Sequence, residues 1–279
     1  MELKGFSGCE LEIIDVDEHK CVRKRSSSID YNHRMLEQKR KQSDVHIGDL
    51  NNCRVIDEGN ENGLYYFDME YINGMTLADY MESIELSDIG RMVFKLTNHY
   101  SMYTERDDKA SAFFYRKVSD VKNAIYNNSI VKRDNDTIQE AINELEHYSW
   151  NYVVNSPCHG DMTMENILID KDGCYLIDFL DSFYDTWQID AAKLLQDVEC
   201  YWSYRYKPMT MNLKVRLLIF RDLCIEKIMK MQSGKYFLDS VYHILLLNIL
   251  RIFPYVKNER DYLFLVGTLS NINKKLGGH

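Results

Sequence analysis

Three polar residues near the middle of the chain have the types and spacing that phosphoryl transfer needs. Asp161 and Asn166 lie five positions apart in the segment HGDMTMENILIDKDGCYLID, and Asp178 ends the second of its short apolar runs. A carboxylate on a loop can orient a hydroxyl group and receive its proton. An amide oxygen and a second carboxylate can hold magnesium ions against phosphates. This pattern predicts Asp161 as the catalytic residue, with Asn166 and Asp178 as metal ligands.

A simpler interpretation of the same segment is a β-hairpin whose acidic residues are solvated turn positions. Asp172 and Gly173 stand between two apolar runs, as a hairpin turn requires. A hairpin explains this turn, but it gives no reason for the polar residues on either side of it. We therefore favour the catalytic interpretation.

The segment is similar to the protein-kinase signature H-R-D-x-x-x-x-N followed by D-F-G, written here as H-G-D-x-x-x-x-N and Asp178-Phe179-Leu180. Its HGD form, followed by ILID and LIDF, resembles the aminoglycoside phosphotransferase and choline kinase superfamily of small-molecule kinases. The resemblance implies an α+β, bilobal protein-kinase-like fold that uses ATP and Mg²⁺. A small β-rich nucleotide-binding lobe would span residues 1–73, and a larger, mainly helical catalytic and substrate-binding lobe residues 74–279.

A kinase of this fold needs a strand lysine for the ATP phosphates and a helix glutamate that orients it. The segment Cys21-Val22-Arg23-Lys24 has the form of the V-A-I-K strand, and strand alternation places Val22 and Lys24 on one face. On the next helix, Glu37 lies beside an apolar stripe and fits the partner glutamate. For Lys24, the alternative is an edge strand of solvated basic residues. For Glu37, the alternative is a simple surface charge.

The resemblance also indicates how adenine would be bound. Residues 66–74, YFDMEYING, resemble the hinge strand of the fold. By this resemblance the carbonyl of Glu70 accepts from the exocyclic amine, and the amide of Ile72 donates to a ring nitrogen. The segment Gly5-Phe6-Ser7-Gly8 offers backbone amides to a phosphate but lacks the full glycine-rich pattern.

Other residues near the motif are expected to support it. His159 is predicted to buttress the catalytic loop by hydrogen bonding. Asp190, at the start of a helix, matches the acidic residue that anchors this loop in the family. Asp181 has the spacing of a further acidic group that assists metal or substrate binding, but a solvated turn position explains it equally well.

Hydrophobic periodicity predicts the elements that must position these residues. Strands are expected at residues 10–16, 19–25, 53–57 and 65–71, with EGNENG as the turn of the second hairpin and a helix over residues 30–43. Residues 166–178 form a strand pair. Helical spacing covers roughly residues 76–82, 87–105, 110–128, 135–149, 188–205, 212–231, 235–252 and 259–274.

Composition limits the other function classes. A net charge of −9 over 279 residues disfavours nucleic-acid binding, which needs clustered Lys and Arg. The acidic surface suits a cationic substrate but serves solubility equally well. The longest apolar runs are too short to span a bilayer, and the N-terminus lacks a signal-peptide core. Seven dispersed cysteines argue against a disulfide framework, so we expect a cytoplasmic protein.

The sequence thus predicts an ATP- and magnesium-dependent kinase that phosphorylates a hydroxyl group of a small molecule, namely a sugar, an amino alcohol or an aminoglycoside. No A-P-E motif or long activation segment follows Asp178, which argues against a protein kinase. A non-catalytic pseudokinase that binds nucleotide and a kinase acting on a protein or polymer are the alternatives. The sequence specifies neither the acceptor nor the choice between ATP and GTP, and it leaves the oligomeric state open.

Overall fold

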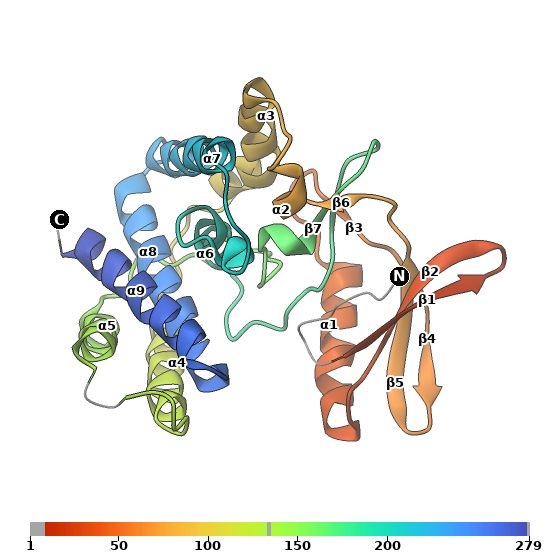
Figure 1. Ribbon diagram of the computed structural model, residues 1–279, viewed down its shortest axis with the longest axis horizontal. Coiled ribbons are helices and arrows are strands. Elements are labelled where there is room, and N and C mark those ends of the chain that lie inside the picture. The colour runs from red at the N-terminus through yellow and green to blue at the C-terminus, as the bar shows by residue number, and fades with distance from the viewer. Residues whose placement is uncertain (1–8, 133–134, 278–279) are drawn as a thin grey trace.

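The N-terminal part of the computed structural model, which describes residues 9–132 and 135–277, is a four-stranded antiparallel sheet packed on one long helix (Figure 1). The strand order is β1-β2-β5-β4, and the helix α1 stands against the sheet. Their bounds are β1 Glu10–Val16, β2 His19–Arg25, α1 Asn32–Asp44, β4 Val55–Glu61 and β5 Leu64–Glu70. A 3-10 turn at Ile29–Tyr31 leads into α1.

The hairpin between β4 and β5 turns more tightly than the sequence indicates. β4 continues through the EGNE residues to Glu61, with an irregular register between Val55 and Asp57. The turn consists only of Asn62 and Gly63, whose φ angles are +52° and +81°. Asn-Gly tolerates positive φ at both central positions, so a two-residue loop is sufficient here. The expectation that all of EGNENG forms the turn is therefore wrong.

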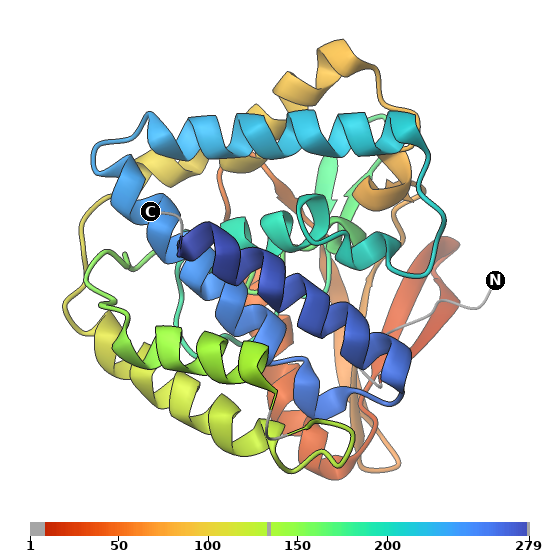
Figure 2. The same cartoon turned by 60° about the vertical axis from the view of Figure 1, so that its left-hand side comes forward.

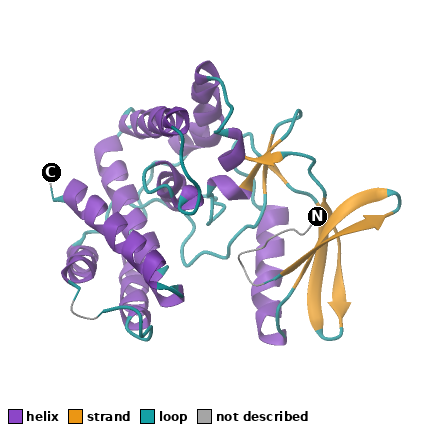
Figure 3. Cartoon of the chain, in the orientation of Figure 1, coloured by secondary structure: helices purple, strands orange, loops and turns teal. Residues whose placement is uncertain are grey.

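A second, smaller sheet lies between the N-terminal part and the helices, as Figure 3 shows in orange. Its order is β3-β8-β7-β6, with β3 Asn51–Asn52, β6 Met75–Thr76, β7 Ile167–Ile169 and β8 Cys174–Leu176. β7 and β8 are the predicted strand pair. The two-residue strands β3 and β6 were not predicted, since two residues show no alternation. This sheet joins segments before and after residue 73, and the division into lobes at that residue stays a prediction.

Helices make up most of the chain after Thr76, and Figure 2 shows α9 crossing in front of α8, with α7 running above them. Most of them begin and end within a few residues of the predicted ranges. The helices are α2 Leu77–Tyr80, α3 Leu86–Thr97, α4 Ala110–Ile125, α5 Asp136–His147, α6 Trp187–Val198, α7 Met211–Met229, α8 Gly234–Leu250 and α9 Glu259–Leu276. The expected helices over residues 87–105 and 188–205 end earlier, each followed by a 3-10 turn.

Two hydrophobic cores hold the chain together, a small one in the N-terminal part and a large one among the helices. α6 and α8 lie at the centre of the large core and are buried along most of their length. The segment Gly234–Tyr255 is long and apolar enough to cross a membrane, but 72% of its most apolar window is buried inside this core. All seven cysteines are buried and free. The predicted combination of a β-rich part and a larger helical part is confirmed.

Candidate active site

The catalytic loop is fixed to the helical core by one buried carboxylate. Asp190, in the first turn of α6, accepts the backbone amide of His159 at 2.7 Å and that of Gly160 at 2.8 Å. Burial raises the pKa of Asp190 to about 7, although these two hydrogen bonds act in the opposite direction. The prediction that Asp190 anchors the catalytic loop is confirmed.

His159 connects the two halves of the motif. Its Nε2 atom lies 2.7 Å from the carbonyl oxygen of Ile177, just before Asp178, and its Nδ1 atom accepts the amide of Asp161 at 3.1 Å. Because Nδ1 is an acceptor, the ring proton lies on Nε2 and is donated to Ile177. Burial lowers the pKa of this ring to about 4, so it is neutral near pH 7. The predicted buttressing role of His159 is confirmed.

Gly160 allows a close approach that no other residue permits. Its φ angle is +87°, and an added Cβ would lie 2.2 Å from Ser182 Oγ and 2.7 Å from the Leu180 carbonyl oxygen. We expect Gly160→Ala to lower the free energy of unfolding by about 2 kcal/mol or more, through backbone strain and displacement of the backbone at Leu180. Urea unfolding measures this change.

The matched control for this prediction is Gly90→Ala in the middle of α3, where an added Cβ meets nothing within 4 Å. Alanine there raises helix propensity, so the control is expected to stabilise the protein by up to about 1 kcal/mol. Equal effects at Gly160 and Gly90 would contradict the close approach.

Both carboxylate oxygens of Asp161 are engaged. Lys193 Nζ lies 2.9 Å from Oδ1, and Asn166 Nδ2 donates to Oδ2 at 3.2 Å and to the Asp161 carbonyl at 2.8 Å. Burial raises the pKa of Asp161, but the charge and hydrogen bond of Lys193 outweigh it and hold the pKa below its ordinary value. Asp161 is therefore ionised at neutral pH, with about a third of its side chain exposed.

Lys193 is a site residue that the sequence interpretation missed. It lies on the same face of α6 as two buried acidic residues, Asp190 and Asp197, at positions i, i+3 and i+7. Asp197 accepts the amide of Met164 at 2.6 Å and the amide and hydroxyl of Ser203. One helix face thus holds the catalytic loop at three points. Three charged residues at helical spacing, in a helix whose other residues are uncharged, are the signal that would have identified Lys193.

We expect Lys193→Gln to move the acid limb of the kcat profile to higher pH. Loss of the cation removes the main influence that lowers the pKa of Asp161 and leaves burial, which raises it. Turnover requires the ionised carboxylate, so activity below neutrality falls first, and kcat falls roughly tenfold or more because Asp161 also loses a positioning contact. The profile between pH 4.5 and 8 measures this change, with the exposed Lys214→Gln as control. An acid limb at the wild-type position would contradict the role of Lys193.

The second part of the site joins the N-terminal sheet to the motif. Lys24 on β2, only 2% exposed, contacts the carboxylate of Asp178. Asp178 has a φ angle of +63°, a left-handed conformation that is uncommon for residues other than glycine. The structure therefore brings together two of the predicted residues that lie 154 positions apart in the sequence, Lys24 and Asp178.

Glu37 does not meet Lys24. Its carboxylate pairs with Arg40 at 2.7 Å, whereas the buried Gln38 places Oε1 3.4 Å from Lys24 Nζ. On a helix, Gln38 lies at i+3 from the buried Met35 and shares its inward face, while Glu37 at i+2 does not. The prediction that Glu37 orients Lys24 is wrong, and an uncharged glutamine stands at that place.

The neighbouring Arg23 faces the other side of the sheet, as strand alternation predicts. Its guanidinium makes two hydrogen bonds to the buried Asp68, at 2.8 and 2.9 Å, and a third to Glu61. It also stacks on Tyr66, 3.9 Å from the ring centroid. The interpretation of β2 as an edge strand of solvated basic residues fits neither Arg23 nor Lys24.

A lysine on α1 links the N-terminal part to the segment after Asp178. Lys41 Nζ lies 2.6 Å from Asp185 Oδ1, 3.0 Å from the Leu180 carbonyl oxygen and 3.3 Å from Ser182 Oγ. Three contacts to one segment make Lys41 a cross-link between the two parts that carry Lys24 and Asp161.

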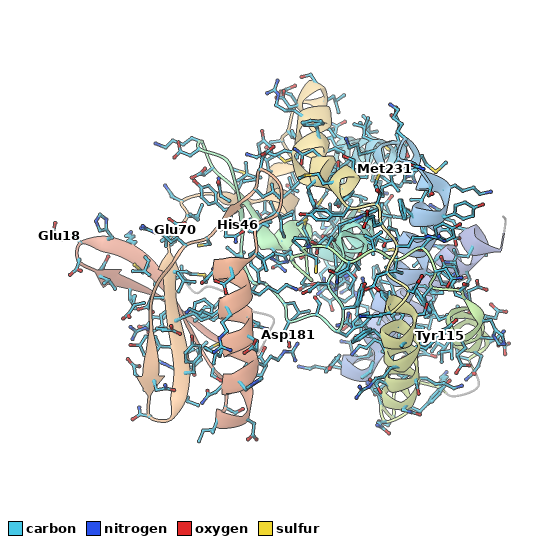
Figure 4. The ribbon with its side chains drawn as sticks, turned by 180° about the vertical axis from the view of Figure 1, so that it is seen from behind. Glu18, His46, Glu70, Tyr115, Asp181 and Met231 are labelled. Atoms are coloured by element: carbon cyan, nitrogen blue, oxygen red, sulfur yellow. The ribbon has the colours of Figure 1, made fainter. Side chains whose placement is uncertain are left out.

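The predicted hinge residues lie at the junction of the two parts, where Figure 4 labels Glu70. The Glu70 carbonyl accepts the Cys53 thiol at 3.0 Å, so an adenine amine would share or displace that contact. The Ile72 amide donates to no acceptor among residues 9–132 and 135–277. The predicted adenine contacts of Glu70 and Ile72 stay predictions.

Two further expectations concern residues around the motif. Asp181 is exposed on the segment that passes between α1 and the helices, as its label in Figure 4 shows. The glycine segment 5–8 lies outside the described residues. A hollow of about 480 Å³ adjoins the hinge but contains none of the catalytic residues, being lined by Asn73, Gly74, Met75, Tyr80, Ile169, Asp170 and Lys171.

The side chains near Asp161 fit a magnesium ion by their chemistry. The side-chain amide nitrogen of Asn166 donates to Asp161. The side-chain oxygen of Asn166 accepts no hydrogen bond in the described part of the chain, so it is available to a metal ion. This oxygen and the Asp178 carboxylate are hard donors of the kind that Mg²⁺ prefers. No group of three His, Cys, Asp or Glu side chains that could hold a metal occurs in the described ranges.

Comparison with known proteins identifies the family. Residues 20–207, which include Lys24, the catalytic loop and Asp178, match the Phosphotransferase enzyme family (APH). The chain belongs to this family. No curated protein in the comparison matched the sequence.

Solved structures agree with the family at the level of the fold. A thermostable mutant of aminoglycoside phosphotransferase APH(4)-Ia, in a ternary complex with AMP-PNP and hygromycin B, matches with a TM-score of 0.66 and 15% identity over 100% of this chain and 94% of that one. A putative fructosamine-3-kinase from Haemophilus somnus 129PT matches with a TM-score of 0.57 and 13% identity, over 96% of this chain and 90% of that one. Amicoumacin kinase hAmiN, in complex with AMP-PNP, Ca²⁺ and Ami, matches with a TM-score of 0.57 and 12% identity, over 98% of this chain and 87% of that one. The predicted protein-kinase-like fold is confirmed.

Proposed function

We propose that this protein is a cytoplasmic, ATP- and Mg²⁺-dependent kinase that transfers the γ-phosphoryl group to a hydroxyl of a small molecule. Membership of a phosphotransferase family supports group transfer. The observation that carries the proposal is the position of Asp161, partly exposed and held through both oxygens by Lys193 and Asn166. A carboxylate fixed in this way suits the alignment of an attacking hydroxyl.

In this mechanism the acceptor oxygen attacks the γ-phosphorus as the bond to the β-γ bridging oxygen breaks, and ADP leaves. The hydroxyl proton passes to the Asp161 carboxylate and from there to solvent. A low pKa does not prevent this role, because phosphoryl transfer proceeds through a loose transition state in which the proton moves late. Asp161 acts mainly by orienting the hydroxyl, and Lys193 and Asn166 act by positioning Asp161.

On the nucleotide side, Lys24 binds the α- and β-phosphates, and the Glu70 carbonyl and Ile72 amide bind adenine. Asn166 and Asp178 hold magnesium, which when bound neutralises the developing charge on the phosphate oxygens. Half-buried apolar side chains near Lys24 and Asp178, including Val22, Ile72 and Ile177, pack on the small core and offer an apolar surface to the base.

The test is ADP release from magnesium-ATP across a panel of sugars, amino alcohols, nucleosides and aminoglycosides. Release that depends on one class of acceptor, and that Asp161→Asn abolishes, is the expected result. Nucleotide binding without release for any member would favour the pseudokinase alternative. ADP release only with a protein or polymer acceptor would favour the alternative of a kinase that acts on such a substrate.

A further inference from the structure

Two half-buried cations flank the ring of Phe183, five residues beyond Asp178. Lys117 Nζ, on α4, lies 5.7 Å from the ring centroid, and the guanidinium carbon of Arg251, immediately after α8, lies 5.8 Å from it. The ring is fixed by an edge-on contact with Phe114, at 5.0 Å between centroids. α4 packs against both α8 and the 3-10 turn after it (Figure 2). Two helices thus present cations to one aromatic side chain.

Neither cation forms an ion pair with a carboxylate in the described part of the chain. Within the described ranges, the side chain of Arg251 donates a hydrogen bond only to the amide oxygen of Asn248, at 3.3 Å. Burial lowers the pKa of Lys117 and that of Arg251, and the exposed Arg34 on α1 acts in the same direction, whereas Asp120 raises the pKa of Lys117 and Asp161 raises that of Arg251. Half-buried like charges near one another are unfavourable unless an anion compensates them. The chain has a net charge of −9, yet none of the three side chains of this cation cluster, Arg34, Lys117 and Arg251, forms an ion pair with a carboxylate among residues 9–132 and 135–277.

The cluster lies beside the catalytic loop. The amide of Leu180 donates to the carbonyl of His159 at 3.0 Å, which places the segment leading to Phe183 directly against this loop. An acceptor with its hydroxyl at Asp161 would therefore extend toward the cations.

We propose that the acceptor carries an oxyanion, a phosphate or carboxylate group, which Arg251 and Lys117 bind while Asp161 faces the reacting hydroxyl. This inference rests on the proposed function and narrows its acceptor to an anionic hydroxy compound. The planar guanidinium suits bidentate contact with an oxyanion, and the lysine supplies a second, compact charge. The same cations repel the amines of an aminoglycoside or choline, so the site selects against cationic acceptors.

The first test measures binding of inorganic phosphate while magnesium–AMP-PNP fills the nucleotide site. Lys117→Gln and Arg251→Gln are each expected to weaken phosphate binding at least about tenfold, because each removes a charged hydrogen-bond donor. The matched control is Arg116→Gln, an exposed arginine on α4 next to Lys117, which should bind phosphate as the wild type does. Thermal unfolding of all three variants checks that they remain folded.

The second test compares ADP release for paired acceptors: ribose 5-phosphate with ribose, gluconate with sorbitol, and glycerate with glycerol. We expect kcat/KM to favour the anionic member of at least one pair more than about tenfold, and this preference to collapse in Lys117→Gln and Arg251→Gln. Preference for the phosphate or for the carboxylate pairs shows which oxyanion is bound.

The outcomes separate this inference from the proposed function. If all variants bind phosphate as the wild type does, the phosphate is an adventitious ion only and the oxyanion site is overturned. If no form of the protein binds phosphate, the oxyanion site is overturned as well. Turnover that favours the neutral acceptors overturns it as well, but leaves the kinase proposal standing. Phosphate binding that depends on Lys117 and Arg251, without turnover of any pair, supports the oxyanion site and counts against the kinase proposal.

Discussion

Asp161→Asn lowers kcat roughly 10²- to 10⁴-fold, the range expected when a positioned acid–base group is lost, and leaves nucleotide affinity nearly unchanged. Asparagine preserves the shape of the side chain but cannot accept the hydroxyl proton, and it loses the ion pair with Lys193 that lies at 2.9 Å in the wild type. Because Asp161 contacts neither Lys24 nor Asp178 among the described residues, the nucleotide side of the site should keep its geometry.

Steady-state kinetics and nucleotide titration on the same preparation measure the two quantities. The matched control is Asp172→Asn, an exposed residue in the turn between β7 and β8, for which we expect wild-type turnover. Near-normal turnover in Asp161→Asn would remove Asp161 from the catalytic role. An equal loss of nucleotide affinity would indicate that the substitution disturbs the whole loop.

Asp178→Asn weakens magnesium-dependent nucleotide binding by about tenfold or more, since the proposed metal site loses a charged ligand. Asparagine is the informative substitution because it tolerates the left-handed backbone, with φ +63°, that Asp178 adopts.

Titration of a fluorescent ATP analogue at several magnesium concentrations measures this effect. In the wild type the nucleotide affinity should rise with magnesium, and in Asp178→Asn this dependence should nearly vanish. A variant whose affinity keeps the wild-type magnesium dependence would contradict the assignment of Asp178 as a metal ligand.

Local patterns in the sequence were sufficient for most of the fold. β1 and β2 have the predicted bounds, because two short runs that contain apolar residues stand on either side of an acidic turn. The motif likewise predicted the anchoring of the catalytic loop by Asp190. Elements that depend on distant partners were missed. β3 and β6 are only two residues long, and their pairing with β8 and β7 defines them as strands.

The site shows the same limit at the level of single side chains. Choosing between Glu37 and Gln38 depends on how α1 is rotated against the sheet, and a family pattern favoured the charged residue. The helical spacing from Met35 favours Gln38, and this criterion decides correctly. The cation cluster was not foreseeable, because Lys117 and Arg251 lie far apart in the sequence and only the packing of their elements brings both near Phe183.

The central claim is that phosphorus leaves ATP and becomes a phosphate monoester on a small hydroxyl compound in a reaction that depends on Asp161. ³¹P NMR of the reaction with magnesium-ATP and the best acceptor follows this transfer directly. The account predicts a new monoester resonance that grows in equal amount with ADP for the wild-type protein and not for Asp161→Asn. ADP accompanied only by inorganic phosphate, or monoester formed equally by both proteins, would contradict it.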